Sequence, residues 1–267
     1  CLYQLQRYDQ AQAVLEAQVK ADSSQVPEAS YWLGMTQKAR GQFETASKTL
    51  LEAYAKFPST SLSAEMLFYA AQALFQQGQF APAIDRFLEV TTKFPTHDLV
   101  DDSLYYAAES ARATAQHDRA FALASQFYKQ FPQSPLTNRM ALAIGQSLIA
   151  LARNDEAAKS LADLVARHPE PALAVPGQYY RAVALHAGGK LDESLATLEA
   201  LLADPSAGNK DAALAQIFAD AQFLADGQVL KVGVPGGEPP CRRAGEAEVG
   251  VQEAVDDALP HAPDVGG

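Results

Sequence analysis

Apolar side chains recur along the chain three or four residues apart, as Leu50, Ala53 and Tyr54 do. Residues with this spacing share one face of an α-helix, whereas a half-buried strand alternates at every second residue. No stretch alternates in the second way for long enough to predict a sheet. The pattern therefore predicts an all-α fold.

A turn-like string of three residues recurs six times and divides the helical pattern into similar lengths. The last residues of successive strings lie 35, 37, 37, 37 and 37 residues apart. A period of this size is typical of stacked helical hairpins. The strings are Gln6-Arg7-Tyr8, Gly41-Gln42-Phe43, Gly78-Gln79-Phe80, Ala115-Gln116-His117, Ala152-Arg153-Asn154 and Gly189-Lys190-Leu191.

Small residues and prolines keep a constant distance from these strings. Small side chains let two helix backbones approach closely. A large one there would overpack the contact and lower the stability of the fold by about 1–3 kcal/mol. A proline ends the second helix of a hairpin. The small residues before the strings are Gly34, Ala71, Ala108, Gly145 and Ala182, those after them are Ala11, Ala46, Ala83, Ala120, Ala157 and Ser194, and the prolines are Pro58, Pro95, Pro132 and Pro169.

The chain resembles the tetratricopeptide repeat family in the run Gly41-Gln42-Phe43-Glu44-Thr45-Ala46, with Leu33-Gly34 before it and Phe57-Pro58 after it. Departures from the family pattern are His117, Asn154 and Ser194. The resemblance implies a right-handed α-solenoid of stacked antiparallel helix pairs. It also implies a non-enzymatic scaffold that binds proteins through a concave groove.

The endings of three second helices are similar to those of one subgroup of this family. They read Lys56-Phe57-Pro58, Lys93-Phe94-Pro95 and Gln130-Phe131-Pro132. Bacterial cell-envelope members, namely outer-membrane assembly lipoproteins and Tol–Pal accessory proteins, carry such endings. The sequence leaves the compartment open between the periplasmic side of the cell envelope and the cytoplasm.

The repeat register predicts two regions in the chain. Residues 1–227 form the array, with an incomplete first repeat, about six repeats in all, and the first helix of a seventh. That last helix is expected over 212–226, with a turn at Asp226-Gly227. Residues 228–267 are rich in Gly, Pro and Glu and are interpreted as a disordered or out-of-frame tail.

The charge balance narrows the class of partner. The chain has 32 acidic and 21 basic residues, which give a formal charge of −11. An anionic surface repels phosphate backbones, so nucleic acid is not an expected partner. The longest mostly apolar stretch, residues 140–151, is too short to span a bilayer.

The sequence contains no recognisable catalytic, metal or cofactor motif. None of its five histidines has a metal-binding spacing, and it lacks both a phosphate-binding P-loop and a nucleophile elbow. Asp101 and Asp102 precede an apolar run and are interpreted as a helix-start cap, with a two-carboxylate active site as the alternative. We expect no enzyme activity, no cofactor and no metal.

The resemblance implies a groove lined by the first helix of each pair. Its positions lie three residues before, one residue after and four residues after the first small residue of each repeat. The aromatic members either grip a partner or pack between neighbouring helices, and the sequence leaves both open. The candidate groove residues are Tyr31, Met35, Phe68, Gln72, Phe75, Tyr105, Glu109, Arg112, Leu142, Tyr179 and His186.

Chaperone-binding members of the family hold an acidic chain end with a clamp of Lys, Asn and Arg, which these positions lack. The sequence thus predicts a scaffold for another protein or peptide segment. The alternative function is a regulatory or targeting arm of a larger enzyme. Self-association through incomplete array ends, where Ile217, Phe218 and Phe223 lie, is the third hypothesis.

Overall fold

The computed structural model describes residues 2–21, 26–203 and 212–231, which form twelve helices. No strand occurs in these ranges, and the all-α prediction is confirmed. Among the described helices, none has the length and apolar character needed to cross a bilayer. The tail expected over 228–267 lies outside the described residues from 232 onward.

The helices follow one another as first and second members of pairs, with a short turn inside each pair. Each second helix of three successive pairs ends two residues before a proline, as expected. The helices are α1 Tyr8–Lys20, α2 Val26–Ala39, α3 Phe43–Lys56, α4 Ser63–Gln76, α5 Phe80–Lys93, α6 Val100–Ala113, α7 His117–Gln130, α8 Thr137–Ala150, α9 Asn154–Arg167, α10 Pro171–Ala187, α11 Leu191–Leu202 and α12 Ala212–Lys231.

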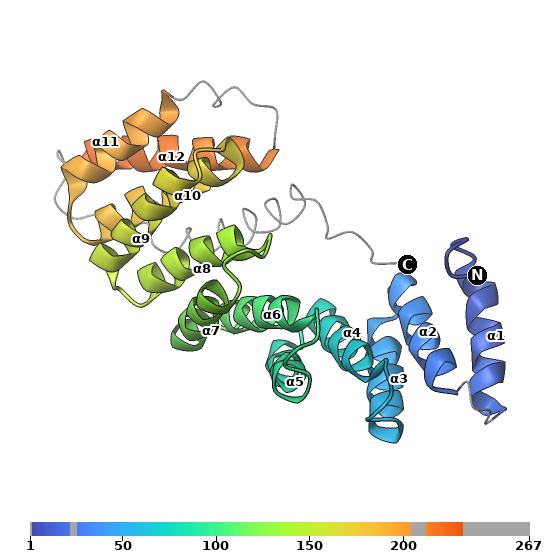
Figure 1. Cartoon of the computed structure of the whole chain (residues 1–267). Helices are drawn as coiled ribbons and strands as arrows, with labels where there is room; N and C mark the ends of the chain where they lie inside the picture. Colours follow the sequence, from blue (N-terminus) through green and yellow to red (C-terminus); the bar gives the residue numbers. More distant parts are fainter. Residues whose placement is uncertain (1, 22–25, 204–211, 232–267) are drawn as a thin grey trace. The chain divides into compact units, whose positions relative to one another are not determined.

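Two compact units, residues 1–143 and 144–267, divide the chain within α8. In the first unit, each helix from α1 to α7 contacts the next, and the first helices α2, α4 and α6 also contact one another in turn (Figure 1). In the second unit, α9 contacts α10, α10 contacts α11, and α12 contacts both α10 and α11. Consecutive pairing of this kind is the expected all-α solenoid of helix pairs.

All six predicted turn strings form the same turn. The first residue of each string has a positive φ, which is 72° at Gly41 and 54° at Ala115. The next residue closes the turn, because its N–H donates to the carbonyl five residues earlier, as from Gln42 to Gln37 at 2.9 Å. This is the hydrogen bond of a Schellman helix ending. Glycine adopts this conformation freely, whereas Gln6, Ala115 and Ala152 adopt it against their preference.

The small residues lie where the two helices of a pair touch. A Cβ added to Gly34 in α2 would lie 2.6 Å from Cδ2 of Leu50 in α3, and one added to Gly145 would lie 2.5 Å from Cδ2 of Leu161. Ala46 is fully buried in the same contact layer. Close backbone approach is therefore the reason for the small residues, as the sequence indicated.

The last helix differs from the prediction. α12 continues through Gly227 to Lys231, so the turn expected at Asp226-Gly227 is wrong. Gly227 does not have the positive φ that the glycines of the other turns adopt.

Candidate functional site

The eleven predicted groove residues lie at two depths. Six are at least nine-tenths buried, and five are half-buried. We refer to Tyr31, Phe68 and Tyr105 of the first unit as the interior row. We refer to Met35, Gln72, Phe75 and Arg112 of the same unit as the surface row. The remaining buried residues are Glu109, Leu142 and Tyr179, and the remaining half-buried residue is His186.

The interior row connects neighbouring first helices. Each aromatic in it is followed directly by a second aromatic, and the two rings of each doublet lie 5.1–5.2 Å apart. Tyr31 of α2 lies 6.1 Å from Tyr69 of α4, and Phe68 of α4 lies 6.0 Å from Tyr106 of α6. These aromatics therefore pack between helices, which was one of the two interpretations of the sequence.

Sequence reasoning missed the second member of each doublet. Tyr69 and Tyr106 are half-buried on α4 and α6, and they recur at the 37-residue period. Trp32 is the matching residue of α2, and Tyr180 that of α10. The repeated doublet was visible in the sequence and could have identified these positions.

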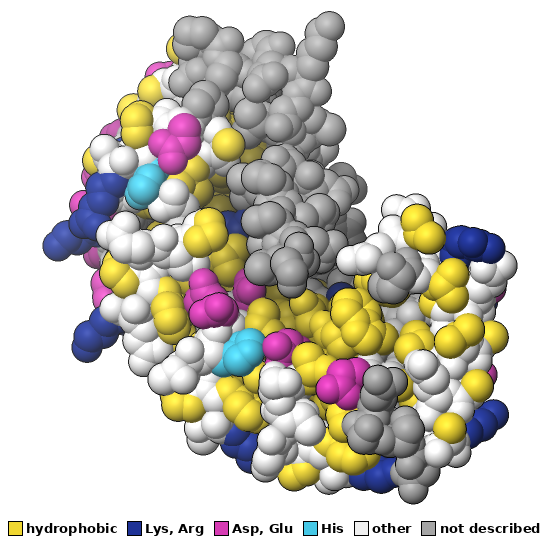
Figure 2. All heavy atoms as spheres, turned by 45° about the vertical axis from the view of Figure 1, so that its right-hand side comes forward, with side chains coloured by type: hydrophobic (Ala, Val, Ile, Leu, Met, Phe, Trp, Pro, Cys, Tyr) yellow, Lys and Arg dark blue, Asp and Glu magenta, His cyan; other side chains and the backbone are white. Residues whose placement is uncertain are grey.

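Polar side chains of the surface row bridge successive first helices or pair within one. The Gln72 Nε2 donates to Tyr106 Oη at 3.1 Å, and Arg112 Nη2 lies 2.9 Å from Glu109 Oε2. Figure 2 shows one face of the chain, on which hydrophobic side chains gather with acidic side chains beside them. The face formed by α2, α4 and α6 thus combines aromatic, amide and charged groups, and we refer to it as the first-helix face.

Asp101 and Asp102 lie in the first turn of α6, whose N-cap is Leu99, so the capping role expected for them is wrong. Both oxygens of Asp101 accept hydrogen bonds, one from the Asp102 N–H at 2.9 Å and one from Ser134 Oγ at 2.8 Å. The Asp102 carboxyl accepts none within the described chain. Burial, and to a smaller extent the charge of Asp101, raises the pKa of Asp102 to about 6.

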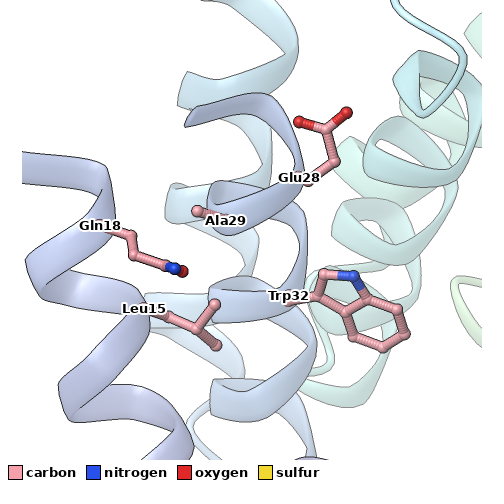
Figure 3. Close-up of a pocket in the computed structure, with 5 residues that line it drawn as sticks. All are labelled: Leu15, Gln18, Glu28, Ala29 and Trp32. Carbon is pink, nitrogen blue, oxygen red and sulfur yellow. The ribbon is translucent and has the colours of Figure 1, made fainter. Parts of the chain in front are cut away.

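A pocket of about 290 Å³ lies between α1 and α2 (Figure 3). Leu15 occupies the place in α1 that Leu50 occupies in α3, 35 residues later. The helices α1 and α2 contact one another as α3 and α4 do, so the pocket lies in a contact between successive helix pairs. We therefore assign the pocket to repeat packing. It is lined by Leu15, Gln18, Glu28, Ala29 and Trp32.

Within the described ranges, no group of three or more His, Cys, Asp or Glu side chains is arranged to hold a metal ion. His117 and Asn154, which replace the aromatic of the turn string, each bury one polar atom without a partner. These two atoms lie at helix starts and on separate pairs. They mark weaker packing of single turns.

Comparison with known families agrees with the repeat register. A model of the tetratricopeptide repeat matches residues 2–59, 35–98 and 142–210, and a second model of the same repeat matches 102–134. The first model alone covers more than half of the chain. No curated protein matches the sequence significantly.

Solved structures share the fold at low sequence identity. The C-terminal part of a TPR repeat-containing protein from Cytophaga hutchinsonii is 14% identical, with a TM-score of 0.68 and 97% of each chain covered. A tetratricopeptide repeat protein from Parabacteroides merdae is 15% identical, with a TM-score of 0.60 and coverage of 96% of this chain and 93% of that one. BtubC from P. vanneervenii is 12% identical, with a TM-score of 0.57, and 89% and 94% are covered. The repeat register, the helix pairs and the family match agree, and the chain belongs to the tetratricopeptide repeat family.

Proposed function

We propose that this chain is a non-enzymatic scaffold that binds a segment of another protein along its first-helix face. Repeats of this family commonly mediate protein–protein interaction. The observation that carries the proposal is the surface row, in which half-buried apolar and polar side chains recur on successive first helices. Half-buried side chains present contact area at a low entropic cost, because neighbouring helices already restrain them.

The two rows contribute differently to this proposal. The interior row shapes the face, since its aromatic side chains lie against neighbouring helices. The surface row supplies the contact, and Met35 and Phe75 are its apolar members. In the second unit, we propose that the buried Tyr179 of α10 shapes the face and that the half-buried His186 of α10 contacts the partner.

The test is a selection of peptides for the full chain from a displayed library, followed by affinity measurements. We expect Met35→Ala with Phe75→Ala to weaken the selected peptides about tenfold or more, because two apolar contacts are lost. The matched control is Leu51→Ala with Leu88→Ala, two half-buried leucines on the second helices α3 and α5. Equal effects of the two double variants, or no selected peptide at all, would contradict the proposal.

We also propose that exposed apolar side chains allow association with a second copy of the chain. Of the residues expected at the array end, Phe223 of α12 is 61% exposed, but Ile217 is fully buried and its expected exposure is wrong. Val14 of α1 is 50% exposed, and Trp32 of α2 is 37% exposed. Exposed apolar groups of this size favour association. Light scattering should show oligomers that Val14→Ser and Phe223→Ser together abolish, and a monomer at every concentration would dismiss the idea.

Two further hypotheses stay predictions from the sequence. The cell-envelope subgroup rests on the Phe-Pro endings of the second helices. The regulatory or targeting arm of a larger enzyme is the alternative function.

A further inference from the structure

The cations on the first-helix face, and Arg139 of the neighbouring helix α8, are already engaged with side chains of that face. Lys38 Nζ lies 4.9 Å from the centre of the Tyr69 ring, and Arg139 Nη1 donates to Tyr105 Oη at 3.2 Å. Arg112 pairs with the buried carboxylate of Glu109. Because each cation has such a contact, the face offers little positive charge to a partner.

Three acceptor groups on α4 and α6 are not satisfied in this way. The Asp102 side chain has no hydrogen bond or ion pair with the described residues, although it is half-buried. Glu65 Oε2 is buried without a hydrogen-bond partner, and its other oxygen lies 3.6 Å from His97 Nε2. Gln72 Oε1 is likewise buried without a donor. Donors are therefore what this part of the face lacks.

The repeat register places these groups together on one face. Glu65 and Asp102 are 37 residues apart, so they occupy equivalent places in the first turns of α4 and α6. Gln72 lies two turns after Glu65 on α4 and reaches α6 through its bond to Tyr106. The interior-row rings Phe68 and Tyr105 lie one turn from the two carboxyl groups along the same helices.

Desolvation without a partner is costly for a carboxylate, and a cation placed against it removes most of that cost. The raised pKa of Asp102 reflects this state, since burial is its main cause. Asp101 next to it is satisfied by two donors and shows that the helix start alone does not leave an aspartate unpaired. The Asp102 carboxylate that a cationic partner would meet is therefore in place before any partner binds.

We propose that the segment bound on the first-helix face carries an Arg or Lys side chain that pairs with Asp102 at the start of α6. This inference rests on the proposed function and names the chemistry of its partner. An acidic segment is excluded, because its carboxylates would face Asp102 and Glu65 without a compensating cation.

The experiment is a parallel selection from a displayed library of random 12-residue peptides against three full-length proteins. These are the wild type, Asp102→Asn, and Asp118→Asn as the control. Asp118 is exposed on the second helix α7, so both variants lose the same net charge. The control therefore separates pairing at Asp102 from general attraction to a chain with a net charge of −11.

We expect Arg and Lys to be enriched about fivefold or more in the peptides selected by the wild type and by Asp118→Asn, and not by Asp102→Asn. When the enriched Arg of a selected peptide becomes Gln, its affinity should fall about tenfold for the wild type and for Asp118→Asn, and should not fall for Asp102→Asn. Peptides selected without excess Arg or Lys, or with equal excess on all three proteins, would overturn the inference and leave the proposed function standing. No selected peptide on any protein would overturn both. Circular dichroism of each variant confirms that it is folded.

Discussion

Phe68 and Phe75 are the same residue type on the same helix, two turns apart, yet they lie in different surroundings. Phe68 is 3% exposed and contacts the rings of Phe87 and Tyr106. Phe75 is half-buried and contacts Phe80 and Tyr106. The comparison teaches that two rings on one helix face can differ in depth although both contact Tyr106 of the next pair. The interior row packs between helices, and the surface row is the part that we propose contacts a partner.

The largest expected effect separates these two phenylalanines directly. Phe68→Ala should destabilise the first unit by about 3–5 kcal/mol, because it removes a fully packed ring. Phe75→Ala should cost about 1–2 kcal/mol, because part of the ring already faces solvent. Urea unfolding followed through Trp32, the single tryptophan of the chain, measures both. Equal costs would remove the distinction between the rows.

A second variant tests how tightly the interior is packed. Gly34→Ala should destabilise by about 1–3 kcal/mol, because the new Cβ would overlap Leu50 of the paired helix. In a Leu50→Ala background the same change should cost much less, since the overlapping atoms are gone. Unfolding of the four proteins of this cycle gives the coupling. If the two losses of stability simply add, the new Cβ at position 34 does not overlap the Leu50 side chain.

The turns and small residues differ from the buried aromatics in how far the sequence predicts them. The six turn strings and the small residues beside them depend on local spacing, so they were predicted correctly. Depth was not predictable at Tyr31, Phe68 and Tyr105, because it depends on how the neighbouring first helix covers them. The positive φ of Ala115 followed from its place in the string rather than from its residue type.

Asp102 shows where sequence reasoning ended at the site. Its place near a helix start was visible, but the burial that leaves its carboxyl group unpaired depends on packing between repeats. The missed tyrosines, Tyr69 and Tyr106, were visible as repeated doublets. α12 was predicted to end near Gly227, and the absence of a turn there could not be read from a glycine alone.

A smaller effect on the free energy of unfolding is expected at Asp102, which lies on the first-helix face. The pKa of Asp102 in the fold, about 6, lies above its usual 3.8, so the fold favours the protonated form. The wild type is therefore relatively more stable below about pH 4 and loses this contribution as the pH rises through about 6. Asp102→Asn removes the titration. It should stabilise the chain by about 1–2 kcal/mol at pH 7.5, after discounting for partial exposure, and by nothing at pH 4. Urea unfolding at the two pH values measures the gain, and an equal gain at both would contradict the assignment.

The smallest change in the free energy of unfolding is expected in the turns, whose residues belong to neither row. Ala115→Gly should stabilise by about 0.5–1 kcal/mol, because glycine adopts the positive φ without strain. Ala113→Gly, at the exposed end of α6, is the control and should destabilise by a similar amount. Thermal unfolding of both variants is sufficient. A loss of stability in both would show that the turn is not strained at Ala115.

The most direct test of the division between the rows is hydrogen exchange of the full chain with and without a selected peptide. The account predicts slower exchange in α2, α4 and α6 on binding, and unchanged exchange in the second helices α3 and α5. Met35→Ala with Phe75→Ala should remove this protection without changing exchange in the free chain by more than local amounts. Protection that falls on α3 and α5, or on no helix of the first unit, would contradict the claim that the first-helix face binds the partner.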